Sequence, residues 1–156
     1  MKKLDIFNLV SGGILQITNY DLEPAHAYKV TKFRTAVNKA LDDIKNAEKD
    51  ILKGLGIVDP AEIDKKIYDL KSKNPLTEEE QQELEHLQDL VKKFNETRRQ
   101  MLEEETTLEN VKTLPFEQWH ALRKENRPKD ANSYDPLNNY VEELLEGILW
   151  KAPEDK

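Results

Sequence analysis

Apolar side chains recur at alternating spacings of three and four residues in two long segments of the chain, roughly residues 24–53 and 77–105. This spacing places them along one face of an α-helix and is typical of helices that pair as a coiled coil. The first segment carries one series of large residues and a second series of mostly small ones: Val30, Val37, Ile44 and Ile51, then Phe33, Ala40, Ala47 and Gly54. The stripe of the second segment turns polar after two heptads: Leu84, Leu87, Val91, Phe94, Arg98, Met101, Glu105 and Leu108.

Small residues opposite large ones would let the two helices approach closely, with Leu87 or Phe94 packed against Ala40 and Ala47. We therefore expect an antiparallel, coiled-coil-like hairpin within one chain, its stripes paired from about Val30–Ile51 against Leu84–Met101. Pairing of the same stripes between two chains is the alternative, and it would make the protein a homo-oligomer.

Residues that favour helix starts and helix ends mark the boundaries of the predicted helices. The glycines of Gly54-Leu55-Gly56 offer the left-handed conformation that ends a helix. Asp59-Pro60-Ala61-Glu62 then predicts an extra short helix at the hairpin tip, with Asp59 as its cap. Asn74-Pro75 ends this helix, and the spacing of Thr77 and Glu80 matches a capping box that starts the second long helix.

The segments outside the hairpin are less regular. Residues 14–18, which follow an apolar run over 4–10 and two glycines, are rich in strand-forming side chains and could pair with residues 106–114 as a two-stranded β element. Pro115 opens a short helical segment, and a last helix with a wide apolar face begins at Asp135-Pro136. The fold class that follows is mainly α, as a single helix-rich domain over residues 1–150 with a flexible tail over 151–156.

Composition excludes several classes of function. The formal net charge is −7, so a nucleic-acid phosphate backbone would meet no excess of positive charge. The chain has no cysteine, which removes disulfides and thiolate chemistry together. No stretch is apolar over the length that a membrane span needs, and the N-terminus lacks a secretory signal. We expect a soluble, cytoplasmic protein that binds neither nucleic acid nor membranes.

Catalytic and metal-binding signatures are missing from the sequence. Glu83 and His86 have the Glu-x-x-His spacing of di-metal helical bundles, but such a site needs the same motif on a facing helix. Glu117 and His120 repeat the spacing only on a short segment after Pro115. No phosphate-binding loop or serine elbow is present. We expect no catalytic residues, no cofactor and no metal, and the sequence favours a protein that is not an enzyme; a di-metal hydrolase is the weakest alternative.

Five side chains are candidates for binding a partner. Arg98 interrupts the second apolar stripe: either its aliphatic stem covers the stripe while its head reaches water or an acid such as Asp43 or Asp50, or it forms a buried ion pair that sets the register of the hairpin. The other four are aromatic residues, which can either close the core or dock a partner if exposed. They gather in the last third of the chain: Phe116, Trp119, Tyr140 and Trp150.

The stretch Leu15-Gln16-Ile17-Thr18-Asn19, followed by Ala27-Tyr28-Lys29-Val30 and a long charged helix, resembles a family of small tailed-phage proteins of uncharacterised function. Its members have a short strand ending in Asn, a charged helical hairpin and a short acidic helical C-terminal part. The segment from Ile57 to Pro75 is longer than the usual tip of that hairpin. The resemblance implies a phage or prophage origin, no catalytic residues, and a role in virion assembly or in binding host proteins.

These observations together predict a non-enzymatic phage or prophage protein that acts by protein–protein interaction, in the host cytoplasm or in the virion. A virion or tail assembly component, or an accessory protein, fits the resemblance. The alternative is a small acidic inhibitor of a host defence or nucleic-acid-binding protein, because an acidic surface can be steered onto a basic site.

Overall fold

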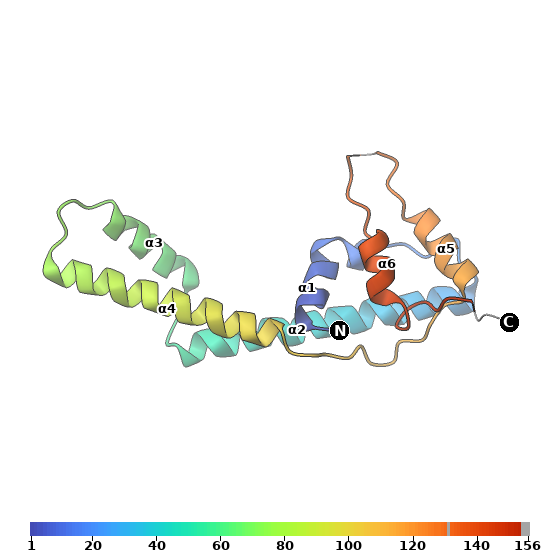
Figure 1. Ribbon diagram of the computed structural model, residues 1–156, viewed down its shortest axis with the longest axis horizontal. Helices are drawn as coiled ribbons and strands as arrows, with labels where there is room; N and C mark the ends of the chain where they lie inside the picture. Colours follow the sequence, from blue (N-terminus) through green and yellow to red (C-terminus); the bar gives the residue numbers. More distant parts are fainter. Residues whose placement is uncertain (131, 154–156) are drawn as a thin grey trace. The chain divides into compact units, whose positions relative to one another are not determined.

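The computed structural model describes residues 1–130 and 132–153 and confirms a mainly helical chain (Figure 1). The helices follow one another with short or extended connections. In chain order they are α1 (Lys3–Ser11), the 3-10 helix η1 (Ile14–Gln16), α2 (Pro24–Gly54), α3 (Pro60–Lys71), α4 (Glu78–Leu102), α5 (Phe116–Glu125) and α6 (Asn139–Leu145).

The chain divides into two compact units. Unit 1 consists of Met1–Asp43 and Glu104–Lys156, and unit 2 consists of Ile44–Glu103. Helix α2 contributes its first part to unit 1 and its last part to unit 2. Whether the two units fold as the single domain expected over residues 1–150 stays a prediction.

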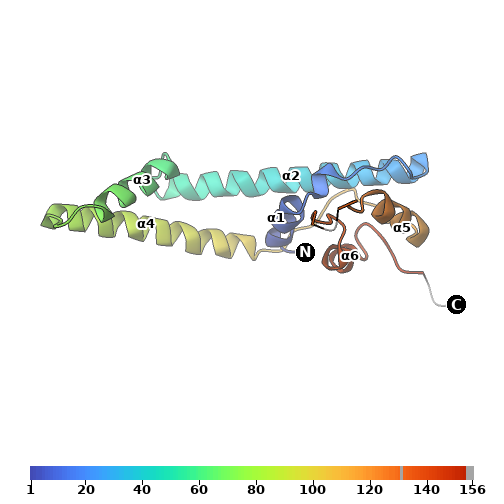
Figure 2. The ribbon, with the colours of Figure 1, turned by 90° about the horizontal axis from the view of Figure 1, so that it is seen from above.

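Unit 1 holds the larger core. Figures 1 and 2 show α1, α5 and α6 beside the first part of α2, and each of these helices contributes buried side chains. Trp119 of α5 and Phe33 of α2 are the largest of its fully enclosed residues. Other fully enclosed residues include Ile6, Ile14, Ile17, Leu114, Leu122, Leu137, Leu145, Leu149, Val30 and Val37.

Unit 2 is built around α3 and α4, which pack side by side (Figure 1). Leu70 of α3 is buried together with Leu84 and Leu87 of α4. Burial of each such leucine stabilises the unit by about 1.5 to 3 kcal/mol before the conformational entropy that it loses is counted. The short helix predicted between the two long ones is therefore confirmed, and its apolar face lies along α4.

The predicted helix starts are confirmed in detail. The Asp59 side chain accepts a hydrogen bond from the amide of Ala61 at 3.1 Å. At the start of α4, the Thr77 hydroxyl accepts a bond from the Glu80 amide at 3.1 Å, and the Glu80 carboxylate accepts one from the Thr77 amide at 3.2 Å. These bonds satisfy amides that a helix leaves unpaired in its first turn.

The predicted hairpin pairing is too long. Val30, Phe33 and Val37 are fully buried, but they belong to unit 1, whereas α4 belongs to unit 2. The apolar stripe of α2 therefore serves two cores in succession, and only its part from Ile44 onward shares a unit with α4. A periodic stripe shows that a face is buried but does not say against what, which is why the sequence overextended the pairing.

The predicted strand over residues 14–18 is wrong. Gly13 adopts a left-handed conformation with φ 94°, and Ile14–Gln16 then forms the 3-10 turn η1. In such a turn residues three apart lie on the same side, so Ile14 and Ile17 are both buried. Residues 106–114 form no named strand either, and the part of the chain that the structure describes contains isolated bridges such as Lys2 with Glu105, but no sheet.

The apolar run over residues 4–10, which precedes this turn, forms helix α1. Ile6 and Leu9, three residues apart, are its buried positions. This spacing fits one face of a helix better than the alternation of a strand. The Asp5 carboxylate accepts a hydrogen bond from the Lys2 amide at 2.8 Å and so stabilises the first turn.

Helix α4 ends earlier than predicted, at Leu102 instead of near Glu105. The acidic residues beyond it are not a frayed helix end, because Glu104 forms an ion pair with Lys3 at 2.6 Å. The backbone carbonyl of Glu104 also accepts a hydrogen bond from the Lys3 amide at 3.0 Å. These bonds hold the start of the extended segment 104–114 against the start of α1.

The last helix is shorter than its apolar spacing predicted. Helix α6 ends at Leu145, and Gly147 with φ 81° turns the chain back, so that the Gly147 amide donates to the Trp150 carbonyl at 2.7 Å. Leu149 and Trp150 are buried after this turn. The dense apolar run thus contains a helix and a returning segment. Of the predicted flexible tail, residues 151–153 are exposed and 154–156 lie outside the described residues.

Candidate functional site

Three of the four aromatic side chains predicted to bind a partner, Phe116, Trp119 and Trp150, pack together in unit 1. Trp119 is 0% exposed and Trp150 is 7% exposed, and their rings stack at a centroid distance of 5.8 Å with 10° between their planes. Phe116 packs against Trp150 at 5.9 Å. A docking role for Trp119 required that it be exposed. Both tryptophans are instead buried in the core of unit 1.

A single glutamate satisfies the polar atoms of this cluster. The Glu142 carboxylate accepts a hydrogen bond from Trp119 Nε1 at 3.0 Å and one from the Arg123 guanidinium at 2.6 Å. The Glu142 backbone carbonyl accepts a third from Trp150 Nε1 at 2.7 Å. Buried indole N–H groups need such acceptors, because leaving one unpaired costs free energy. We call this arrangement of Trp119, Arg123, Glu142 and Trp150 the Glu142 node, and its role is structural.

Tyr140 is the predicted aromatic residue that remains at the surface, with 54% of its area exposed. Its hydroxyl donates to the Asp5 carboxylate at 3.4 Å. Partial burial raises the pKa of Tyr140, and the negative charge of Asp5 raises it further because it disfavours a second negative charge beside it. Tyr140 therefore ties α6 to α1.

Arg98 lies in unit 2, where its Nε donates to the Glu48 carboxylate at 2.8 Å. The side chains of Arg98 and Glu48 are 30% and 26% exposed, so the pair is partly hydrated. Arg98 thus contacts an acid of α2, Glu48, as expected for a snorkelling arginine. The pair links the last part of α2 to α4.

Glu83 and His86 are both exposed on α4. Within residues 1–130 and 132–153, no group of three or more His, Cys, Asp or Glu side chains is arranged to hold a metal ion. Nothing in the geometry of these two residues distinguishes them from an ordinary solvated helix face.

A concave, positively charged site that the sequence did not reveal lies in unit 1, on the first part of α2. We call it the lysine groove and define it by Tyr28, Lys29, Lys32, Asn110 and Lys112. Together with Ala25 these residues enclose a hollow of about 380 Å³. Among the described residues, its lining includes three lysines and no carboxylate.

Two of the lysines are held in place. Lys29 Nζ donates to the backbone carbonyl of Thr113 at 3.3 Å. Lys32 Nζ lies 5.4 Å from the centre of the Tyr28 ring, within the range of a cation–π interaction. Tyr28 itself is 61% exposed, so its ring forms an open wall of the groove. Both positive charges are therefore positioned in a groove whose described lining carries no carboxylate.

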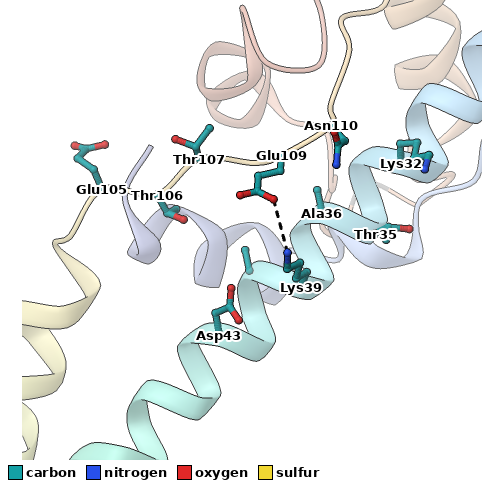
Figure 3. Close-up of a pocket in the computed structure, with 11 residues that line it drawn as sticks. Lys32, Thr35, Ala36, Lys39, Asp43, Glu105, Thr106, Thr107, Glu109 and Asn110 are labelled. Atoms are coloured by element: carbon teal, nitrogen blue, oxygen red, sulfur yellow. Dashed lines mark ion pairs between the residues drawn. The ribbon is translucent and has the colours of Figure 1, made fainter.

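A second hollow of about 490 Å³ adjoins the lysine groove and shares Lys32 and Asn110 with it (Figure 3). Figure 3 shows the segment through Thr107 and Glu109 running opposite α2 across this hollow. Its charge is mixed, because Lys39 forms an ion pair with Glu109 at 3.7 Å and further carboxylates line the wall. These are Asp43 and Glu105. Charge thus changes along α2, from positive in the lysine groove to mixed in the second hollow.

Asn110 stands at the junction of the two hollows in a left-handed conformation, with φ 60°. It is the one residue other than glycine that adopts a positive φ within the described ranges. Non-glycine residues in this conformation are uncommon, although asparagine tolerates it best. The turn at Asn110 redirects the segment so that Lys112 joins the lysine groove.

The segment beside the groove makes few backbone hydrogen bonds. Outside the turn at Glu109 and Asn110, the described residues from Thr107 to Lys112 make no backbone–backbone hydrogen bond, whereas Thr106 on one side and Leu114 on the other are tied to Met1 and Leu149. The amide of Thr106 donates to the Met1 carbonyl at 2.8 Å, and that of Leu114 donates to the Leu149 carbonyl at 2.6 Å. The segment is anchored at both ends and contains one turn between them.

Sequence reasoning missed the lysine groove because Lys112 lies far along the chain from Lys29 and Lys32. Only the fold of unit 1 brings these residues together. The nearest signal was the stretch Ala27-Tyr28-Lys29-Val30, which carried the family resemblance but no assigned role.

Searches of protein-family models, of curated proteins and of solved structures found no match to the chain. In the part of the chain that the structure describes, every helix is too short or too polar to cross a membrane.

Proposed function

We propose that the chain is a non-enzymatic protein of phage or prophage origin that acts by binding another protein, as a virion or tail assembly component or an accessory protein. The observation that carries the proposal is the lysine groove. It is a concave, open surface with three lysines, two of them held in place, in a chain of net charge −7. The phage origin follows from the resemblance alone.

The form of the site favours a polypeptide over a small molecule. Two adjoining hollows run along α2, and their charge changes from positive to mixed along the way. A small metabolite would fill one hollow and leave the other empty. A chain segment can cross both and match the change of charge, which gives specificity as well as attraction.

The proposal gives unit 2 a structural role. We propose that the last part of α2 and α4 act as an antiparallel, coiled-coil-like hairpin, as the apolar stripes predict. The Glu48–Arg98 ion pair supports this pairing within one chain. Ile51, Val91 and Phe94 are only half-buried, so the same stripes could also receive a second copy, which a measurement of mass in solution would reveal.

Co-purification with phage particles tests the proposed function. A tagged chain expressed during infection should appear with assembled particles or with tail intermediates. The double variant Lys32→Glu and Lys112→Glu should reduce this recovery, while Lys45→Glu with Lys49→Glu, which changes the net charge equally on exposed residues of unit 2, should not. Absence of the wild-type chain from particles and intermediates would contradict an assembly role.

A second candidate function, an acidic inhibitor of a host protein, is favoured by the start of α4. Glu78, Glu79, Glu83 and Glu85 are all exposed there and present negative charge to solvent. Such a surface can attract the basic site of a defence or nucleic-acid-binding protein. A host nuclease that the wild-type chain retains at low salt, and that a chain with these four residues changed to Gln does not retain, would support the inhibitor.

A further inference from the structure

We infer that the lysine groove binds an extended, acidic peptide segment of the partner protein, and that carboxylates of this segment contact Lys29, Lys32 and Lys112. This inference rests on the proposed function and adds the chemistry and conformation of the segment that is bound.

Charge is the first argument. Lys29, Lys32 and Lys112 line one hollow whose described lining carries no carboxylate, so their mutual repulsion is relieved when an anionic group enters. The Thr113 carbonyl and the Tyr28 ring already restrain two of them, so little side-chain freedom is lost on binding. The charge of the groove and its restrained lysines therefore both favour the binding of carboxylates.

The backbone of the neighbouring segment is the second argument. Outside the turn at Glu109 and Asn110, the described residues from Thr107 to Lys112 make no backbone–backbone hydrogen bond, and the segment is fixed at both ends. A peptide that lies along it in extended form can pair with these groups, as in binding by strand addition. The open ring of Tyr28 then offers a face for an apolar side chain of the same peptide.

The adjoining hollow decides between an acidic peptide and a nucleic acid. A strand of nucleic acid carries a phosphate at every step, and it would meet Asp43, Glu105 and Glu109 as soon as it passed beyond Lys32. A peptide can place acidic residues at the lysine groove and neutral or basic residues opposite these three carboxylates. The mixed charge of the second hollow and the net charge of −7 both favour the peptide.

Fluorescence anisotropy of labelled peptides tests the inference. The probe is a fluorescein-labelled peptide of eight residues in which glutamate and serine alternate, and its partner probe has glutamine in place of glutamate. The wild-type chain should bind the glutamate peptide saturably and more weakly as salt rises, and Lys32→Glu with Lys112→Glu should weaken binding about tenfold or more, because two attractions become repulsions. Lys45→Glu with Lys49→Glu should leave affinity within about twofold.

The neutral variant Lys32→Gln with Lys112→Gln guards against misfolding, and it should lose affinity while keeping the tryptophan fluorescence of the wild type. Equal affinity for the glutamate and glutamine peptides, or equal loss in the groove and control variants, would overturn the inference. Tighter binding of a single-stranded oligonucleotide of the same charge would also overturn it.

The two proposals fail separately. If charge reversal in the groove lowers entry into phage particles but the wild-type chain does not bind the glutamate peptide, the acidic peptide is wrong and the proposed function stands. If the peptide binds the groove as described but the chain is found with no phage protein, the assembly role is wrong and the groove assignment stands.

Discussion

The Glu142 node allows the packing of unit 1 to be tested quantitatively. In Glu142→Ala, the fully buried Trp119 loses the acceptor of its Nε1 at 3.0 Å, and Arg123, whose side chain is 15% exposed, loses a charged partner at 2.6 Å. An unsatisfied buried donor costs about 1 to 3 kcal/mol, and a hydrogen bond to a charged group contributes about 1.5 to 3 kcal/mol. Arg123 keeps a bond to Asn139 at 3.2 Å, which lowers the total.

We therefore expect Glu142→Ala to reduce the free energy of unfolding of unit 1 by about 2 to 3 kcal/mol. For a chain of this size that corresponds to a fall in Tm of about 5 to 10 °C. Glu142→Gln keeps an acceptor for the indole and loses only the charge, so it should cost about half as much. The backbone carbonyl that accepts from Trp150 is present in both variants.

Thermal unfolding followed by tryptophan fluorescence is the appropriate assay, because both tryptophans of the chain, Trp119 and Trp150, belong to unit 1. Glu143→Ala is the matched control, since Glu143 is an exposed neighbour on the same helix. A loss in Glu142→Ala no larger than in Glu143→Ala would refute the reasoning. It would mean that water replaces the carboxylate at no cost and that the node is not part of the core.

Three further predictions concern other parts of the chain. Arg98→Leu removes a partly hydrated ion pair with Glu48, so it should change the Tm by only a few degrees and leave the mass in light scattering unchanged; a new oligomer would instead show that the pair sets the register. Gly13→Ala places a Cβ at φ 94° and should cost about 1 to 2 kcal/mol in chemical denaturation, and an unchanged midpoint would contradict the turn. The pKa of Tyr140 is raised by burial and by Asp5, so a phenolate absorbance titration should show that Tyr140 ionises at a higher pH than free tyrosine. The folded state therefore loses stability as pH rises from about 10 through that raised pKa. Asp5→Asn should lower the pKa of Tyr140, and an unchanged pKa would argue against the contact.

The parts of the fold that the sequence predicted are those governed by local interactions. Thr77 and Glu80 form their capping box from residues three apart, and Asp59 caps α3 in the same way. Such signals act within one turn of helix and need no knowledge of the tertiary structure. They set the starts of α3 and α4 correctly.

The parts that the sequence mispredicted are decided by burial and by distant partners. Ile14 and Ile17 have strand-forming side chains, but the turn at Gly13 and their burial on one side of η1 outweigh that preference. The heptad stripe of α2 was real, yet residues on either side of Asp43 belong to different units. A seven-residue apolar repeat indicates which face of a helix is buried but not which core that face contacts.

The candidate site could not be predicted from sequence because its residues come from separate segments. The turn at Asn110 and the tie between Thr113 and Lys29 bring Lys112 beside α2. By contrast, the conspicuous aromatic residues Trp119 and Trp150 proved to be interior. A lysine-rich helix face looks like ordinary solvated surface until the fold shows what lies across from it.

Photo-crosslinking from the lysine groove tests the central claim, that this face of unit 1 binds a protein. A benzophenone amino acid replaces Tyr28, which lines the groove and is 61% exposed, or in the control Tyr68, which is 72% exposed on α3 in unit 2. In phage-infected cells we predict a discrete crosslinked protein from position 28 that disappears in Lys32→Glu with Lys112→Glu and is absent from position 68. The same crosslinks from both positions, or crosslinks from position 28 that survive the charge reversal, would contradict the account.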